Sequence, residues 1–159
     1  IDTGSDTLTG GRLKRLEKHL SNDTFLMTYG DGISNININQ LIEFHEKHQK
    51  MITITAVRPP ARFGSLSLNG SDVINFKEKK QLGESWINGG YFVINPDFFK
   101  LIEGDQTVLE KEPLEKVTKI GEIKAFRHEG FWQCMDTKRD VETLENMWEE
   151  GNPPWAQLI

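Results

Sequence analysis

The stretch FLMTYGDGISN, residues 25–35, joins an apolar run to a single carboxylate, Asp31, held between Gly30 and Gly32. The apolar run predicts a short buried strand. In open α/β sheets the ligand crevice lies at the carboxyl ends of strands, so this strand would deliver Asp31 to that crevice. The flanking glycines have no Cβ and let phosphates approach the backbone. A hairpin is the alternative, because Asp-Gly is a favoured turn and residues 33–38 offer a second strand.

The composition is that of a soluble globular domain. The 159 residues carry 19 basic and 24 acidic side chains, a net charge of −5, with 36% hydrophobic residues. We therefore expect a single domain over residues 1–159, without a nucleic-acid partner. The sequence shows no apolar stretch of membrane-spanning length and no signal-peptide pattern. Cys134 is the only cysteine, so no intrachain disulfide can form, and a reduced, cytoplasmic compartment is expected.

Strand and helix patterns alternate along the chain. Helices are predicted over residues 10–20, 39–50, 108–121 and 138–151, strands over residues 24–29 and 51–57, and a strand followed by a helix over residues 87–102. Asn39 and Asn95 are the expected N-caps of two helices. Residues 62–79 predict a hairpin that turns at Asn69-Gly70, and residues 122–137 a strand followed by an aromatic-rich loop. The expected fold is α/β, with a mixed, largely parallel sheet flanked by helices.

Several residues have a structural interpretation beside a functional one. His45 and His48, three apart on a predicted helix, could share a metal, but without a third ligand a place in solvent or at the core edge is favoured. Cys134 lacks a nearby base and is predicted to be packed. Asp136 could cap the helix that follows it.

The segment Gly10-Gly11-Arg12 also has two interpretations. At a helix start its backbone N–H groups could cradle a phosphate while Arg12 adds a fork of donors. It could equally be an ordinary flexible entry to a helix. Local sequence leaves both open.

Five segments occur together and in order: TGGRLKR (9–15), FLMTYGDG (25–32), RFG (62–64), INGGYFVIN (87–95) and GFWQCMDTKRD (130–140). Together they resemble the C-terminal part of the bacterial glucose-1-phosphate cytidylyltransferases, a branch of the sugar-nucleotide pyrophosphorylases. The resemblance spans nearly the whole chain. It implies a nucleotide-diphospho-sugar transferase-like fold that is N-terminally truncated, because the family's Gly-rich N-terminal loop has no counterpart here.

The resemblance also implies an activity. Enzymes of this family join glucose 1-phosphate to CTP, giving CDP-glucose and pyrophosphate by in-line attack on the α-phosphorus. Such catalysis rests on positioning and on charge neutralisation by Mg²⁺ and basic groups. CTP and glucose 1-phosphate are the implied partners, and a homo-oligomer the implied assembly. We expect the chain alone to be inactive. The alternatives are a non-catalytic sugar-phosphate-binding or assembly module, and a sugar-1-phosphate nucleotidyltransferase that uses another NTP.

Site residues follow from the same resemblance. Asp31 and Asp136 are the implied catalytic residues and would jointly hold one Mg²⁺. The implied nucleotide-binding residues are Gly10, Gly11 and Arg12, and the implied sugar-binding residues are Tyr29, Glu78, Lys79, Asn88 and Gly89. The family writes Glu-Lys-Pro where this chain has Lys80, so the loop that carries Lys79 is expected to be less constrained.

Overall fold

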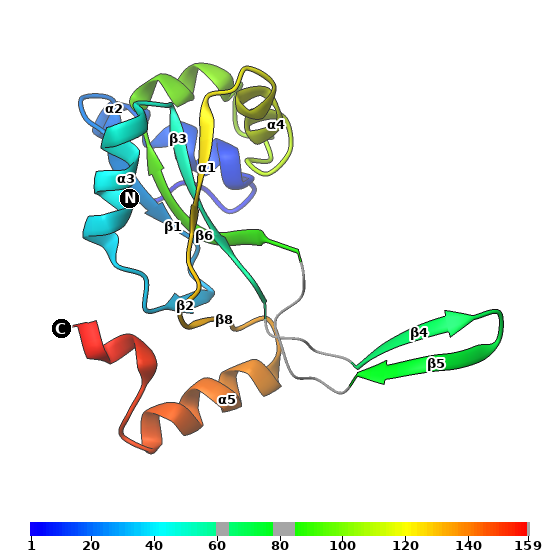
Figure 1. Cartoon of the computed structure of the whole chain (residues 1–159). Coiled ribbons are helices and arrows are strands. Elements are labelled where there is room, and N and C mark those ends of the chain that lie inside the picture. The colour runs from blue at the N-terminus through cyan, green and yellow to red at the C-terminus, as the bar shows by residue number, and fades with distance from the viewer. Residues whose placement is uncertain (60–63, 78–84, 159) are drawn as a thin grey trace. The chain divides into compact units, whose positions relative to one another are not determined.

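The computed structural model describes residues 1–59, 64–77 and 85–158. The chain divides into two compact units, each made of three segments (Figure 1). Unit 1 contains residues 1–30, 37–55 and 90–126, and unit 2 contains residues 31–36, 56–89 and 127–159. The single domain expected over the whole chain stays a prediction. No helix in the described ranges has the length and apolar character needed to span a membrane.

Unit 1 is built around a four-stranded sheet with the strand order β1-β6-β3-β7. Its strands are β1 (Phe25–Thr28), β3 (Ile52–Val57), β6 (Ile87–Ile94) and β7 (Ile123–Arg127). β1 and β6 are antiparallel. β3 and β7 run in the same direction, because Ile52 N donates to Glu122 O and His128 N donates to Ala56 O. The mixed α/β sheet that the sequence predicts is therefore confirmed.

The strand β1 is only half-buried, which corrects the expectation of a buried strand. It lies at an edge of the sheet, and its side chains alternate between the two faces. Phe25 and Met27 pack against the core, whereas Leu26 is 50% exposed. A continuous apolar run does not by itself show that both faces of a strand are covered.

The helices of unit 1 are shorter than predicted. They are α1 (Thr9–Arg15), α2 (Glu17–Leu20), α3 (Ile38–His48), the 3-10 helix η1 (Pro96–Leu101) and α4 (Glu112–Lys119). The single helix expected over residues 10–20 is thus two helices that meet at Leu16.

The N-caps confirm one prediction and correct another. Asn95 Oδ1 accepts from Asp97 N at 2.9 Å, as expected for the cap of η1. For α3 the cap is Asn37, whose Oδ1 accepts from Gln40 N at 3.0 Å, and not Asn39. Both asparagines are suitable caps by residue type, so the error lies within one turn of the helix start.

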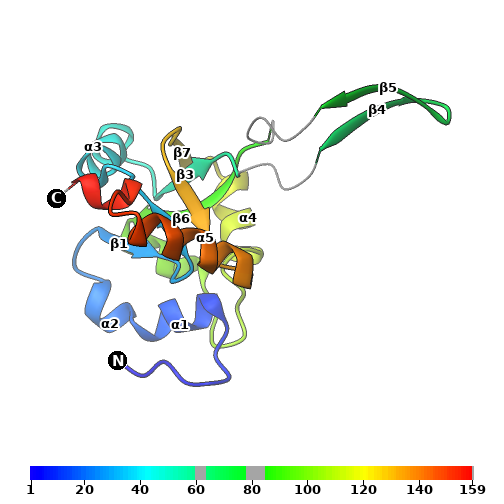
Figure 2. The same ribbon diagram turned by 90° about the horizontal axis from the view of Figure 1, so that it is seen from below.

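The core of unit 1 lies between the sheet and the helices α1, η1 and α4. Leu13, Phe98 and Val117 come from these three helices and are almost fully buried with Ile52 and Phe92 of the sheet. The helix α3 lies on the other side of the sheet from α4 (Figures 1 and 2). Burial of apolar side chains on both faces explains why β3, in the sheet interior, is buried along nearly its whole length.

A buried threonine joins α3 to β3. Thr53 Oγ1 lies 2.9 Å from His45 Nδ1 and 2.7 Å from His48 Nε2. Lys50 N donates to His48 Nδ1 at 2.9 Å. His48 therefore carries its proton on Nε2 and donates to Thr53, and the same Thr53 hydroxyl forms the hydrogen bond to His45 Nδ1. His45, only 5% exposed, belongs to this hydrogen-bond chain, as the structural interpretation of the histidine pair predicts.

The described part of unit 2 contains two separate strand pairs and two helices. Its elements are β2 (Gly32–Ser34), β8 (Trp132–Cys134), β4 (Ser65–Asn69), β5 (Asp72–Lys77), α5 (Lys138–Glu149) and the 3-10 helix η2 (Pro154–Leu158). β2 pairs with β8 and β4 pairs with β5, both antiparallel. The strand predicted within residues 122–137 is β7, and the helix predicted over residues 138–151 is α5. The aromatic-rich loop predicted between them contains an additional strand, β8.

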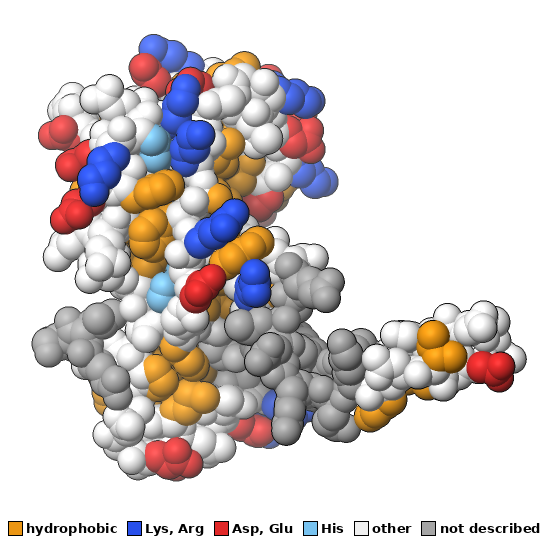
Figure 3. Space-filling view, in the orientation of Figure 1, with side chains coloured by type: hydrophobic (Ala, Val, Ile, Leu, Met, Phe, Trp, Pro, Cys, Tyr) orange, Lys and Arg blue, Asp and Glu red, His pale blue; other side chains and the backbone are white. Residues whose placement is uncertain are grey.

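The β4–β5 hairpin confirms the predicted motif and shifts its turn by one residue. Asn69 pairs with Asp72, so the two-residue loop is Gly70-Ser71 and not Asn69-Gly70. Gly70 has φ of +60°, a conformation that glycine adopts without strain. Apolar side chains along both strands are more than half exposed (Figure 3): Leu66, Leu68, Val73, Ile74 and Phe76.

Candidate active site

The two predicted metal ligands lie at one end of the β2–β8 ladder in unit 2. Gly32 pairs with Cys134, and Met135 N donates to Asp31 O at 2.8 Å. Asp31 directly precedes β2, and Asp136 is the second residue after β8. Because the strands are antiparallel, the start of one and the end of the other meet. Two aspartates that are far apart in the sequence thereby become neighbours on a hydrogen-bonded frame.

The hairpin interpretation of Asp31 is wrong. It requires the strand that follows Asp31-Gly32 to pair with the strand before it. Instead β2 pairs with β8, and β1 pairs with β6. The segment around Asp31 therefore passes from one sheet to another, and its aspartate does not serve a turn between paired strands.

The capping interpretation of Asp136 is also wrong. The N-cap of α5 is Thr137, whose hydroxyl accepts from Asp140 N at 3.2 Å. Asp140 Oδ2 in turn accepts from Thr137 N at 3.1 Å, which completes a capping box. The start of α5 is thus capped without Asp136, and its exposed carboxylate needs another explanation.

Cys134 is half-buried and contacts Asp136. Burial raises the pKa of the Cys134 thiol above its ordinary value, and a hydrogen bond to Asp136 acts in the same direction. A raised pKa keeps the sulfur protonated near neutral pH, so it is a hydrogen-bond donor and a poor nucleophile. Its half-buried position agrees with the prediction that Cys134 is packed.

Trp132 links the aspartates to the predicted sugar pocket, a role that the sequence did not reveal. Its indole N–H donates to Gly89 O at 2.8 Å. Gly32 lies beside the same indole nitrogen, since a Cβ added there would be 3.6 Å from it. Gly89, next to Asn88 on β6, is thus held close to Gly32 and Asp31. The only sequence signal was the position of Trp132 inside the quoted GFWQ pattern.

The glycines of the predicted nucleotide site serve a contact inside unit 1. Gly10 N and Gly11 N both donate to Thr107 O, at 2.9 and 3.3 Å. A Cβ added to Gly11 would overlap the backbone of Asp105. These N–H groups are engaged within the protein, so their use as a phosphate cradle has no support here. A close approach between α1 and this loop accounts for both glycines.

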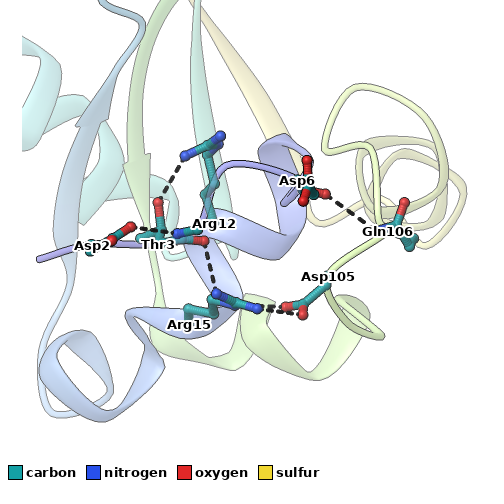
Figure 4. A network of polar contacts seen from close by, with 8 residues as sticks. Asp2, Thr3, Asp6, Arg12, Arg15, Asp105 and Gln106 are labelled. Carbon is teal, nitrogen blue, oxygen red and sulfur yellow. Dashed lines mark hydrogen bonds and ion pairs between the residues drawn. The ribbon is translucent and has the colours of Figure 1, made fainter.

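Arg12 lies in a polar network at the start of the chain (Figure 4). Its guanidinium donates to Thr3 Oγ1 at 3.0 Å and to Ser5 O at 3.2 Å. Beside it, Arg15 forms an ion pair of 2.6 Å with Asp105, which lowers the pKa of that carboxyl. The nucleotide-binding role of Arg12 stays a prediction.

The predicted sugar-binding residues are only partly described. Tyr29, in unit 1, donates through its hydroxyl to Glu110 Oε1 at 2.6 Å and through its N–H to Gly90 O at 2.9 Å. Glu78 and Lys79, together with Lys80, lie outside the described residues. The structure therefore places Gly89 close to Gly32, and all the sugar-binding assignments, that of Gly89 included, stay predictions.

The aspartate pair fits an ion that takes few ligands from the protein. In the described parts of the chain, no three His, Cys, Asp or Glu side chains gather as a metal site would require. Zinc and calcium sites usually need more protein ligands than two. Mg²⁺ is commonly held by one or two carboxylates together with substrate phosphates. Asp31 and Asp136 are therefore suitable in number and chemistry for Mg²⁺.

The sequence of the chain identifies its family. A sequence model of the nucleotidyl transferase family matches residues 9–152, so the chain belongs to that family. It is 47% identical over 156 residues to the glucose-1-phosphate cytidylyltransferase of Salmonella typhimurium, covering 98% of this chain and 61% of that protein. It is 32% identical to a mannose-1-phosphate guanyltransferase of Aspergillus fumigatus, covering 85% of this chain and 39% of that protein. The predicted resemblance to the cytidylyltransferases is confirmed, and the chain spans about three fifths of their length.

Solved structures agree on the fold. HddC from Yersinia pseudotuberculosis, complexed with GMP-PN, matches with a TM-score of 0.70 at 22% identity, over 93% of this chain and 65% of that one. An apo UDP-glucose pyrophosphorylase matches with a TM-score of 0.68 at 13% identity, over 94% and 63%. Identities this low show the fold alone. They confirm the predicted nucleotidyltransferase-like architecture.

Proposed function

We propose that this chain forms part of a nucleotidyltransferase that makes CDP-glucose and pyrophosphate from CTP and α-D-glucose 1-phosphate. The family match and the 47% identity to a glucose-1-phosphate cytidylyltransferase support this choice of substrates. The observation that carries it is the hydrogen bond from Met135 N to Asp31 O, which sets two carboxylates at one end of the β2–β8 ladder. Neither a turn nor a helix cap accounts for them.

The reaction needs an acidic metal site and a fixed acceptor. A phosphate oxygen of the sugar phosphate forms a bond to the α-phosphorus of CTP, while the bond from that phosphorus to the β-phosphate oxygen breaks and pyrophosphate leaves. Asp31 and Asp136 would hold Mg²⁺, which neutralises triphosphate charge when bound. Trp132 fixes the Gly89 backbone beside these aspartates, which orients the predicted sugar-binding segment.

A second candidate keeps the chemistry and changes the nucleotide. The 32% identity to a mannose-1-phosphate guanyltransferase supports this alternative. The higher identity to the cytidylyltransferase favours CTP. A homo-oligomeric assembly and a cytoplasmic location remain part of the proposal.

The test is the effect of the two aspartates on Mg²⁺-dependent turnover in the complete protein that contains this chain. Asp31→Ala and Asp136→Ala should each lower kcat for CDP-glucose formation by at least about 10²-fold, a loss typical of a removed transition-state charge stabiliser. The double variant should lose little more, because residues that serve one ion act as a unit. Asp23→Ala, at an exposed loop position, is the matched control and should retain activity.

Two results would reject the proposal. Near-normal turnover of either single variant at limiting Mg²⁺ would exclude a shared metal. A complete protein that uses GTP in preference to CTP would exclude the cytidylyl assignment. The 159-residue chain alone should release no measurable pyrophosphate from CTP and glucose 1-phosphate, because the resemblance places a triphosphate-binding loop outside these residues.

A further inference from the structure

Two arginines in unit 2 share one tryptophan. The guanidinium carbon of Arg58 lies 4.6 Å from the centroid of the Trp86 ring, and that of Arg127 lies 5.6 Å from it. Trp86 is half-buried, whereas both arginines are exposed. The cation–π contacts fix the two planar groups around one rigid ring. No motif in the sequence pointed to this cluster.

The positive charge of this cluster is not neutralised by the described part of the chain. Neither Arg58 nor Arg127 forms an ion pair with a carboxylate of a described residue. Two like charges near one ring repel each other, and an anion that binds beside them reduces that repulsion. Guanidinium groups match the oxygen geometry of phosphate well, because they offer planar pairs of N–H donors.

The cluster lies where α/β sheets bind their ligands. Arg58 directly follows β3, and Arg127 is the last residue of β7. These strands run in the same direction, so both arginines occupy strand carboxyl ends. That edge of an open α/β sheet is the usual place of the ligand crevice. Trp86 directly precedes β6, two residues before Asn88 of the predicted sugar pocket.

A pocket of about 190 Å³ adjoins Arg58 and is lined also by His128, Glu129 and Gly130. The Ser34 hydroxyl donates to Phe131 O at 2.9 Å, so its proton is committed. His128 Nε2, 3.1 Å from the Ser34 oxygen, is therefore the donor in that pair. In the neutral ring this leaves Nδ1 as an acceptor.

The hydrogen-bond acceptors that line the pocket, Glu129 and His128, disfavour binding of an anion that has no hydroxyl groups to donate. The Glu129 carboxylate repels phosphate, and both this carboxylate and an unprotonated imidazole nitrogen, such as His128 can offer, accept hydrogen bonds from hydroxyl groups. A ligand with a phosphate at one end and hydroxyl groups at the other satisfies Arg58 and Glu129 together. Sugar phosphates have this chemistry, and free inorganic phosphate does not.

We propose that Arg58, Trp86 and Arg127 bind the phosphate of a sugar phosphate whose hydroxyl groups meet Glu129 and His128. The inference deepens the proposed function and rests on it only for the choice of glucose 1-phosphate as the ligand. It assigns to the sugar phosphate five residues that the family resemblance did not mark: Arg58, Trp86, Arg127, His128 and Glu129.

Isothermal titration of the purified 159-residue chain tests this site with glucose 1-phosphate and, separately, inorganic phosphate. The chain should bind glucose 1-phosphate more tightly than it binds inorganic phosphate. Arg58→Gln and Arg127→Gln should each weaken that binding roughly tenfold or more, as expected when a charged hydrogen-bond donor is lost. Arg139→Gln removes the same charge from the exposed surface of α5 and should leave binding unchanged. Circular dichroism checks that each variant is folded.

Glu129→Gln gives a second, opposite readout. Loss of its negative charge should strengthen inorganic phosphate binding and reduce the preference for glucose 1-phosphate. The proposal is overturned if the wild-type chain binds neither probe, if the Arg58 and Arg127 variants bind like the Arg139 control, or if inorganic phosphate binds as tightly as glucose 1-phosphate. Because these are binding measurements without CTP or Mg²⁺, they can succeed or fail independently of the CDP-glucose assay.

Discussion

Replacing Thr53 with Val tests whether the hydrogen bonds between α3 and β3 stabilise unit 1. Thr53 is 0% exposed, and its hydroxyl contacts His45 Nδ1 at 2.9 Å and His48 Nε2 at 2.7 Å. Valine has a similar volume but no hydroxyl. The change therefore removes both hydrogen bonds with little change in packing.

The expected loss follows from the two groups left behind. His45 Nδ1 loses its hydrogen-bond partner, and His48 Nε2–H loses its acceptor. A buried polar group without a partner costs about 1–3 kcal/mol. His45 is almost fully buried, whereas His48 is half-buried and can recover part of its loss from water. We expect the free energy of unfolding to fall by about 2–4 kcal/mol and Tm by about 4–16 °C.

Thr55→Val is the matched control, with the opposite expected result. Thr55 lies on the same strand and is also 0% exposed, but its hydroxyl has no hydrogen-bond partner in the described structure. Its removal should leave stability unchanged or raise it. Urea unfolding followed by circular dichroism gives the comparison. If both variants unfold at the wild-type urea midpoint, or both lose the same amount, the assigned role of the Thr53 hydroxyl is refuted.

Three further predictions concern stability. Burial lowers the pKa values of His45 and His48, so the unfolded chain takes up protons that the folded chain does not. The free energy of unfolding should therefore be unaffected by these histidines above about pH 6.5 and should fall as the pH drops below that value, by up to about 1.4 kcal/mol per pH unit for each histidine. Measuring Tm between about pH 7.5 and 5 checks this. Gly11→Ala should cost at least about 1–3 kcal/mol, because its Cβ would overlap the Asp105 backbone, and urea unfolding measures the loss. Thr137→Ala should cost about 1 kcal/mol through the lost cap of α5, visible in the same assay.

Controls separate these effects from general disturbance. Gly104→Ala adds a Cβ with no atom within 4 Å and should be tolerated, so an equal loss at Gly104 and Gly11 would contradict the packing argument. Thr143→Ala, within α5, should be neutral or slightly stabilising because alanine is the better helix former. A Tm that stays constant down to pH 5 would show that the histidines titrate equally in both states.

Local sequence determined the elements whose signals are local. Periodic apolar residues predicted the helices, Asn95 before Pro96 predicted the start of η1, and residues 62–79 predicted the β4–β5 hairpin. The errors at Asn37 and at the Gly70-Ser71 turn were within a residue or two, whereas the helix predicted over residues 108–121 begins only at Glu112. Neighbouring residues of similar propensity compete for such positions, and small differences in backbone geometry decide between them.

The motif segments determined the candidate chemistry. Asp31 and Asp136 were selected by a family resemblance, and sequence alone left a turn and a cap as rivals. The helix-cap interpretation of Asp136 fails because the hydroxyl of Thr137, and not the Asp136 carboxylate, accepts the hydrogen bond from Asp140 N. Such a choice depends on atomic positions that composition and spacing do not contain.

Only the tertiary structure decided which distant segments meet. The pairing of β2 with β8 joins strands about a hundred residues apart, and the Trp132–Gly89 and His45–Thr53 hydrogen bonds likewise depend on the folded chain. A strand pattern states which face is apolar but not which partner completes its ladder. That partner is chosen by the simultaneous burial of apolar side chains and pairing of backbone groups, a property of the whole folded chain.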